Sequence, residues 1–223
     1  MTTAEDTSLV GSSCPIGDMI CQSTAFPPPR AKGIVDTIND EHLDFCSSMI
    51  WREMLNESII PWAVRKVDLG HDVLEVGPGP GLATEYFASR MERLTAVEID
   101  STLAGALAER MAGSNVDVVN ADATDLPFAD ARFSGAVSFT MLHHVPTGNL
   151  QDVLLREVAR VLVPGAAFIF SDSVASRELE AMHEGDIYNP VDPEGVPDRL
   201  IEAGFVHCKV RRNDFGWAAL GVR

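Results

Sequence analysis

The sequence predicts an α/β fold with a doubly wound, mostly parallel sheet that is preceded by N-terminal helices. After Gly70, short β-rich runs alternate with helical runs, which is typical of a parallel sheet with helices on both faces. The first β-rich run ends in a glycine-rich turn, a common start of such sheets. The last two runs lie too close together for a crossover helix, so we expect them to pair antiparallel.

The chain has 223 residues, enough for one compact domain with a sizeable core. Residues 1–33 are rich in Ser, Thr, Pro and Gly and contain "FPPPR", which predicts a loose N-terminal tail. Residues 34–69 predict a helical cap, because apolar residues recur there at three- and four-residue intervals. Pro61 suits the first turn of a second helix in this cap. The main domain is then residues 70–223.

Within the main domain, the runs of β-branched and apolar residues predict strands over 72–77, 93–100, 116–122, 133–142, 166–173, 205–213 and 216–223. The runs with helical periodicity predict helices over 82–91, 102–112, 150–162 and 196–204. We expect the third of these helices to stop at Pro164-Gly165.

The charge and cysteine content limit the possible partners and the compartment. A net charge of −16 without a Lys/Arg cluster predicts no nucleic-acid partner. No apolar run reaches the roughly 18 residues of a membrane span, and the polar N-terminus does not resemble a signal peptide. We therefore expect a cytoplasmic protein with reduced thiols, because its cysteines form no C-x-x-C pair (Cys14, Cys21, Cys46 and Cys208).

The glycine-rich turn has the pattern E-x-G-x-G-x-G, formed by Glu75, Gly77, Gly79 and Gly81. Glycines there let backbone N–H groups approach a ligand closely. A dinucleotide fingerprint would need a glycine at Leu82. A carboxylate at the entrance of the turn also favours a cationic ligand over a pyrophosphate.

The ends of the next two strands carry further candidates for ligand binding. Glu98 can accept hydrogen bonds from both hydroxyls of a ribose. Asp122 can accept from an adenine amino group, the N–H of Ala123 can donate to the ring, and Leu126 and Phe128 offer apolar cover. Methionine joined to adenosine through a sulfonium fits all these groups, whereas NAD does not.

The pieces "VLEVGPGPG", "TAVEID", "NADATDLPF", "FTMLHHV" and "LLREVARVLVPGAAF" resemble, in order and spacing, the class I S-adenosylmethionine-dependent methyltransferases of the small-molecule branch. The resemblance covers about residues 70–173 and implies a Rossmann-like, seven-stranded sheet whose last strand is antiparallel. It implies S-adenosyl-L-methionine as cofactor and S-adenosyl-L-homocysteine as product, with Ile99 and Thr140 in the same cofactor site. Ala121, where the family often has glycine, is a departure that should be tolerated.

The adjacent histidines His143 and His144 follow the fourth strand, beside the expected methyl position. A base there would remove the proton of an acceptor hydroxyl. His144 is our first candidate and His143 the second, while Asp172 after the fifth strand could orient one of them. "LHHV" followed by such an acid resembles O-methyltransferases of sugars and natural products that use a histidine base.

We predict no metal ligands. Some members of the resembled family clamp vicinal hydroxyls with Mg²⁺, and Asp172, Glu184 and Asp186 could form such a site with His144. We do not adopt this alternative, because these acids are more simply interpreted as solvated surface charges.

The acceptor is expected to bind where the N-terminal helices meet the segment after the fifth strand. Trp51, Met182 and Tyr188 are the candidate lining residues, together with Met54 and His183. Each of these side chains could equally belong to the core or the rim.

The sequence favours an S-adenosylmethionine-dependent O-methyltransferase that acts by in-line transfer on a small molecule. Acidic residues near 178–194 suit a neutral polyhydroxylated acceptor. We therefore prefer a sugar or glycoside as acceptor over a phenol, quinone or polyketide hydroxyl. An N-methyltransferase, an NAD(P)-dependent oxidoreductase and a catalytically silent binding protein stay open. We expect a monomer or homodimer without a membrane partner.

Overall fold

The computed structural model describes residues 38–213 and 216–223. The predicted tail, with Cys14 and Cys21, lies outside these ranges. The described residues form one compact unit, so the N-terminal helices belong to the same unit as the sheet. No helix in the described ranges is both long and apolar enough to cross a membrane.

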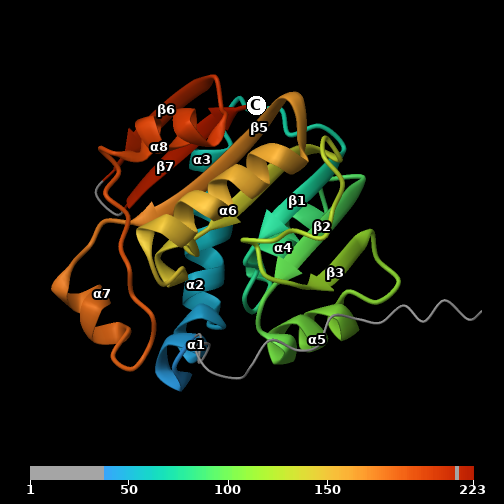
Figure 1. The fold of residues 1–223 in the computed structure, drawn as a ribbon. Helices are drawn as coiled ribbons and strands as arrows, with labels where there is room; N and C mark the ends of the chain where they lie inside the picture. The colour runs from blue at the N-terminus through green and yellow to red at the C-terminus, as the bar shows by residue number, and fades with distance from the viewer. Residues whose placement is uncertain (1–37, 214–215) are drawn as a thin grey trace, which may run out of the picture. The chain divides into compact units, whose positions relative to one another are not determined.

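Seven strands form a single sheet in the order β3-β2-β1-β4-β5-β7-β6, as Figure 1 shows. The strands are β1 (Asp72–Val76), β2 (Arg93–Glu98), β3 (Val116–Asn120), β4 (Phe133–Phe139), β5 (Leu162–Ser173), β6 (His207–Arg212) and β7 (Gly216–Val222). Only β7 runs against its neighbours β5 and β6, which confirms the predicted mostly parallel sheet and its antiparallel last pair. The strand order reverses between β1 and β4, which is where doubly wound sheets bind ligands.

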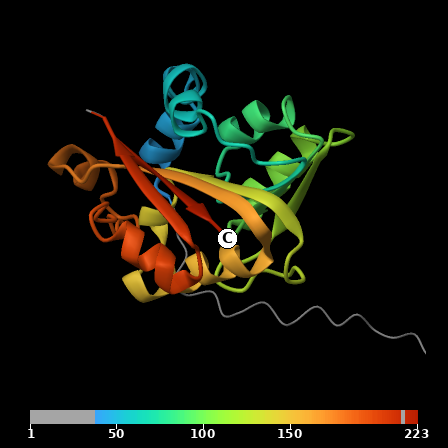
Figure 2. The ribbon, with the colours of Figure 1, turned by 90° about the horizontal axis from the view of Figure 1, so that it is seen from above.

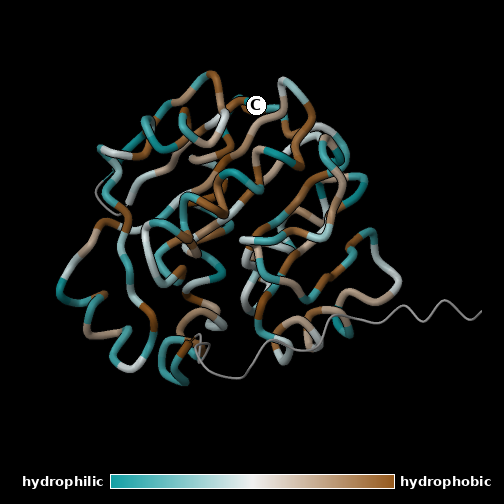
Figure 3. The backbone as a smooth tube through the Cα atoms, viewed as in Figure 1, coloured by the Kyte–Doolittle hydropathy of each residue, from teal (hydrophilic) through white to brown (hydrophobic). Residues whose placement is uncertain are grey.

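Helices cover both faces of the sheet, as the view from above in Figure 2 shows. One face carries α3 (Ile60–Ala63), α4 (Leu82–Ala88) and α5 (Ser101–Arg110), and the other carries α6 (Gly148–Val161) and α8 (Val196–Ala203). Each face has its own cluster of buried apolar residues, and the strands carry much of the hydrophobic colour in Figure 3. The sheet is therefore buried on both faces, as parallel strands require.

The N-terminal helical region divides at Ser47-Ser48, between α1 (Asp40–Cys46) and α2 (Met49–Met54), and not before Pro61 as we predicted. After α1, α2 passes through a π-helical turn, η1 (Leu55–Ile59), into α3. Pro61 lies in the first turn of α3 as expected, but the helix is continuous through the π turn before it. Proline lacks an N–H to donate to the carbonyl four residues earlier, and a wider turn accommodates that loss.

Two predicted boundaries are wrong. Helix α6 ends at Val161 and β5 begins at once, so Pro164-Gly165 lie inside the strand rather than after a helix. Gly165 has a φ of +86°, and the pairing of β4 with β5 shifts register at this end, which is where a strand tolerates proline. Strand β4 ends at Phe139 instead of residue 142, because the chain turns into the 3₁₀ helix η2 (Leu142–His144).

One short helix, α7 (Arg177–Met182), escaped prediction. Its N-cap is Ser176, whose hydroxyl accepts a hydrogen bond from the N–H of Leu179. Figure 1 shows α7 and α1 at the end of the sheet to which the arrowheads of the parallel strands point. The side chain of Asn39 donates to the carbonyl of Met182, which joins α7 to the start of α1.

Candidate functional site

The glycine turn after β1 is held in left-handed backbone conformations. Gly77, Gly79 and Gly81 have φ values of +68°, +52° and +85°. A Cβ atom at Gly77 would lie 2.1 Å from Cγ of Met141, and one at Gly81 would lie 2.4 Å from Cδ1 of Leu107. A Cβ atom at Gly79 would meet nothing within 4 Å. The chain's own packing thus explains two of the glycines, and only Gly79 faces space that a ligand could fill.

Glu98 connects the end of β2 to this turn. Its Oε2 accepts a hydrogen bond from the N–H of Gly79 at 2.9 Å, and its Oε1 accepts from the N–H of Asp100 at 2.9 Å. Burial raises the pKa of Glu98, and these backbone donors offset part of that effect. Each oxygen keeps a second lone pair, so the carboxylate can still accept from ribose hydroxyls.

Glu75 is buried within β1, with 2% of its surface exposed, and its Oε2 has no hydrogen-bond partner. Burial raises the pKa of Glu75 to about 7, the hydroxyl of Thr84 offsets this effect in part, and the charge of Glu98 adds to it. A buried carboxyl without a partner is costly. A cationic group of a ligand would relieve that cost, as expected for the ammonium or sulfonium of S-adenosylmethionine.

The predicted adenine-binding segment is partly occupied by its own contacts. Oδ1 of Asp122 accepts hydrogen bonds from the N–H and hydroxyl of Thr124 at 2.8 and 2.7 Å. Leu126 is buried in the core, and Phe128 is half-buried and packs edge-on against Phe133. Ile99 is the exposed apolar side chain beside Glu98, with 45% of its surface accessible. Ala123 is half-buried.

Thr140 follows β4 with a φ of +51°, which is rare for a β-branched residue. Its N–H donates to the carbonyl of Ser171 at 2.8 Å, and its hydroxyl donates to the carbonyl of Phe139. Such backbone conformations cost on the order of 1–3 kcal/mol and cluster at functional sites. Here the turn directs Met141 over Gly77 and brings η2 to the end of the sheet.

His143 is paired with Asp172. Its Nδ1 lies 2.6 Å from Oδ1 of Asp172, and its backbone N–H donates to Oδ2 at 3.2 Å. Both side chains are buried, and Nε2 of His143 has no partner. Because a carboxylate only accepts, the contact favours the tautomer with the proton on Nδ1 and the lone pair on Nε2.

His144 is our first candidate for the base. Among the residues that the structure describes, no carboxylate is hydrogen-bonded to it. Its Nδ1 is buried without a partner. Burial, followed by the neighbouring imidazoles of His143, His42 and His183, lowers the pKa of His144 to about 2. The ring is therefore neutral, and Asp172 orients His143 instead.

Two further histidines complete a cluster that the sequence did not predict. His42 of α1 and His183, directly after α7, are 5% and 4% exposed. The His42 ring lies 5.2 Å from the His144 ring and 4.3 Å from the His183 ring. Nδ1 of His42 contacts Oδ2 of Asp186 at 3.1 Å, although 144 positions separate the two residues. No motif spacing could reveal partners so distant in the chain.

Two acids that we interpreted as solvated surface charges are buried. The side chains of Asp172 and Asp186 are 2% and 1% exposed, because each contacts a buried imidazole. Glu184 is exposed, as predicted.

The predicted acceptor residues separate into two places. Tyr188 stacks on His183 with ring centroids 4.4 Å apart, and Met182 ends α7 beside the cluster. Trp51 instead packs against Phe45 and the apolar cluster of the α4 face.

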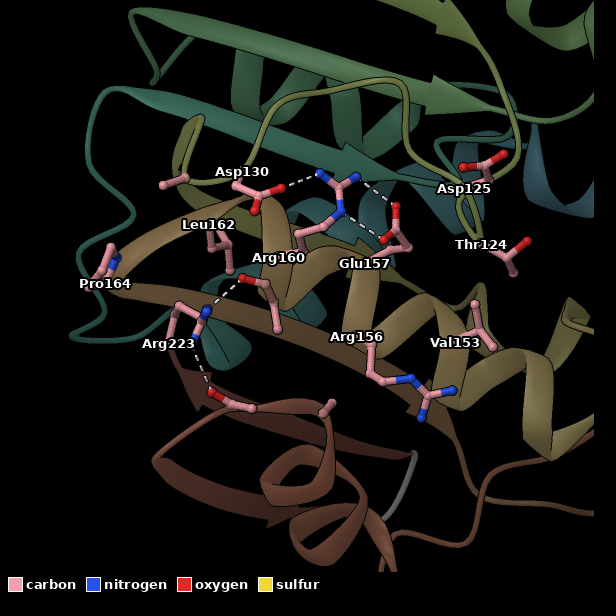
Figure 4. Close-up of a pocket in the computed structure, with 14 residues that line it drawn as sticks. Thr124, Asp125, Asp130, Val153, Arg156, Glu157, Arg160, Leu162, Pro164 and Arg223 are labelled. Atoms are coloured by element: carbon pink, nitrogen blue, oxygen red, sulfur yellow. Dashed lines mark hydrogen bonds and ion pairs between the residues drawn. The ribbon is translucent and has the colours of Figure 1, made fainter. Parts of the chain in front are cut away.

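A separate cavity of about 560 Å³ lies between α6, the start of β5 and the C-terminus (Figure 4). None of the predicted site residues lines it. Arg160 bonds to Asp130 and Glu157 across one wall, and Arg223 donates to backbone carbonyls at another. We therefore place the site at the strand ends and not in this cavity.

Comparisons with known proteins bear on the kind of protein that this chain resembles. Residues 74–170 match the model of a methyltransferase domain family. A fatty-acid O-methyltransferase of Mycolicibacterium smegmatis is 36% identical over 47% of this chain and 38% of its own length. A ribosomal RNA small subunit methyltransferase A of Deinococcus radiodurans is 48% identical over 48% of this chain and 36% of its own length. The chain thus spans well under half the length of these curated relatives.

A solved structure of a Haemonchus contortus N-methyltransferase, in complex with phosphomonomethylethanolamine and S-adenosylhomocysteine, has the same fold. It superposes with a TM-score of 0.63 at 14% identity and covers 82% of this chain and 59% of its own. The glycine turn, the carboxylates and these matches favour S-adenosylmethionine over the NAD(P) that we left open. The match of residues 74–170 to a methyltransferase domain family agrees with this preference.

Proposed function

We propose that the protein methylates a hydroxyl of a small molecule, with His143 as general base. The observation that carries this proposal is the contact between His143 and Asp172 at the ends of β4 and β5, which leaves Nε2 of His143 free to accept a proton. The proposal revises our first choice of His144.

The residues that would hold the cofactor lie at the ends of β1, β2 and β3. Gly79 leaves space beside the backbone, and Glu75 has an unpartnered oxygen. Glu98 and Asp122 supply acceptors for the ribose and adenine. Bound S-adenosylmethionine supplies a methyl group on a cationic sulfur, the electrophile of the reaction.

The chain's own residues would orient the acceptor and move one proton. Nε2 of His143 takes the proton of the acceptor hydroxyl as the oxygen forms its bond to the methyl carbon. Asp172 keeps the proton on Nδ1 and stabilises the imidazolium that results. Removing such a base typically costs roughly 10²–10⁴ in rate.

The acceptor that we propose is a neutral polyhydroxylated compound such as a sugar or glycoside. Tyr188 beside His183 offers a ring on which a sugar face could pack, and Glu178, Glu180 and Glu184 would disfavour an anionic acceptor. The match to a fatty-acid O-methyltransferase supports oxygen as the methylated atom.

Methylation of an RNA base is the second candidate, because a ribosomal RNA methyltransferase is among the relatives. Two features argue against it. A net charge of −16 repels a phosphate backbone. Strand β4 ends in "FTMLHH", without the D/N-P-P-Y type of sequence found in nucleic-acid amino-methyltransferases.

Radiolabelled methyl transfer to four acceptor panels tests the proposal: glycosides, phenols, fatty acids and ribosomal RNA. Calorimetric titration with S-adenosylhomocysteine and with NADH precedes it. Micromolar binding of the former alone and label in a glycoside or phenol ether support the proposal. Label in RNA, or activity that survives His143→Ala, contradicts it.

A further inference from the structure

The histidines at the junction of α1, η2 and α7 form a group that the proposed reaction does not use. We propose that His42, His144 and His183 bind one divalent transition-metal ion of the zinc class. This inference does not depend on the proposed function, because it concerns three side chains other than the base.

The geometry of the three residues suits a single ion. Each offers one ring nitrogen, and these atoms all lie within 4.8 Å of one another. Zinc bound by imidazole at 2.0–2.1 Å in a tetrahedral site needs nitrogens about 3.3 Å apart. Small rotations of the side chains would therefore close the site around an ion.

The hydrogen bonds of the rings leave nitrogens free to bind. Nδ1 of His183 bonds to the carbonyl of Leu179 at 2.6 Å, so its Nε2 is left buried without a partner. Nδ1 of His42 contacts the carboxylate of Asp186, and Nδ1 of His144 is buried without a partner. Metal-binding histidines typically bond to a carboxylate or carbonyl through the other ring nitrogen.

Unpartnered buried nitrogens also need an explanation of their own. A buried polar atom without a hydrogen bond costs on the order of 1–3 kcal/mol. Two of the three rings contribute such an atom, and both rings belong to one cluster. One ion between the rings would bind both unpartnered nitrogens. Histidines that serve only to pack a core would not place such nitrogens together.

The donor set selects the class of metal. Imidazole nitrogens suit Zn²⁺, Co²⁺, Ni²⁺ and Cu²⁺, whereas Mg²⁺ and Ca²⁺ prefer oxygen ligands. The carboxylates of Asp172 and Asp186 are engaged by His143 and His42. The proposed site thus differs from the Mg²⁺ clamp considered from the sequence. It leaves a fourth tetrahedral position for water or a small ligand.

The test uses the full chain without an affinity tag, stripped with a chelator and titrated with Co²⁺. We expect visible d–d bands with the intensity of a tetrahedral site, saturation at one equivalent, and displacement by Zn²⁺. We also expect Zn²⁺ at about a hundredfold excess over its Kd to raise the unfolding midpoint by roughly 5–10 °C. Absence of the bands, or a thiolate-to-cobalt charge-transfer band, would overturn the proposal.

Variants locate the ion. His42→Gln and His183→Gln should each weaken Co²⁺ binding at least tenfold, whereas His207→Gln on β6, which is exposed, should bind as the wild type does. Equal affinity in all three variants would overturn the assignment. Pulsed EPR of the Cu²⁺-loaded wild type counts coordinated imidazoles even if a variant fails to fold. Three supports the site, and fewer contradicts it.

Discussion

At the ends of β1, β2 and β3, polar groups are held by backbone hydrogen bonds from nearby residues, whereas at the ends of β4 and β5 imidazole rings from distant segments meet. On the first, cofactor side, Glu98 accepts from Gly79, which is 19 positions away. On the second, acceptor side, His42 contacts Asp186 across 144 positions. The contacts of the cofactor side thus join residues that are close in the sequence, whereas those of the acceptor side join residues that only folding brings together.

The largest expected effect lies on the acceptor side. His143→Ala should lower kcat by roughly 10²–10⁴-fold and leave the Kd for S-adenosylhomocysteine unchanged, because this ring serves the acceptor. Single-turnover rates and calorimetry measure the two quantities, and His207→Ala is the control. A kcat within a few-fold of wild type would favour an N-methyltransferase, which needs no strong base.

A second effect concerns the buried carboxyl on the cofactor side. The pKa of Glu75 is raised from 4.5 to about 7, so the folded chain holds this proton at pH values where the unfolded chain has lost it. Stability should therefore fall as the pH rises from about 4.5 to about 7 and stay lowered above that range. Integrated over this pH range, the loss in the free energy of unfolding is about 3 kcal/mol.

Glu75→Gln removes this titration. Urea unfolding at pH 5 and pH 8 should show a smaller loss of stability in the variant than in the wild type, with the exposed Glu109→Gln as control. Equal losses in the variant and the wild type would mean that Glu75 does not carry the penalty. Cofactor binding near pH 7 should also release a proton, because a cationic ligand lowers the pKa of the carboxyl.

The glycine turn offers a test with a matched control. Gly79 and Gly113 both have a positive φ, and a Cβ atom at either would meet nothing within 4 Å. Alanine at either position should therefore destabilise the protein by about 1 kcal/mol. Only Gly79→Ala should weaken S-adenosylhomocysteine binding, by roughly tenfold, since only this turn belongs to the proposed cofactor site. Equal Kd values in the two variants would remove the turn from the cofactor site.

The smallest expected effect is at the rim of the cofactor side. Ile99→Ala should raise the Kd for S-adenosylhomocysteine about two- to fivefold, through loss of about 0.5–1 kcal/mol of apolar contact. Because Ile99 is 45% exposed, the unfolding free energy should change little. Val206→Ala, at 66% exposure outside the site, should leave that Kd as it is, and a similar change in both would contradict the placement.

The contrast between the two sides also explains what the sequence could predict. The strand and helix alternation predicts the sheet, and the short connection before β7 predicts its antiparallel pairing. The turn at Gly77–Gly81 and the acid Glu98 follow from spacing alone. These features depend on neighbours within a few tens of residues.

The acceptor side could be predicted only in part. Asp172 and the pair of adjacent histidines were identified, yet which ring meets the carboxylate depends on the positive φ of Thr140 and the 3₁₀ turn after it. His42 gives no local signal, because it is one histidine in an ordinary short helix, and His183 was a candidate only for the acceptor pocket.

The hydrogen bond from Gly79 to Glu98 has one more consequence. Because this bond ties the turn to β2, the proposed binding surface is preorganised, and ligand binding does not have to order a loop. Replacement of Glu98 would therefore have two effects, since it would remove the acceptor that we propose for the ribose and release the backbone of Gly79. The same side chain would thus serve both ligand recognition and the rigidity of the turn.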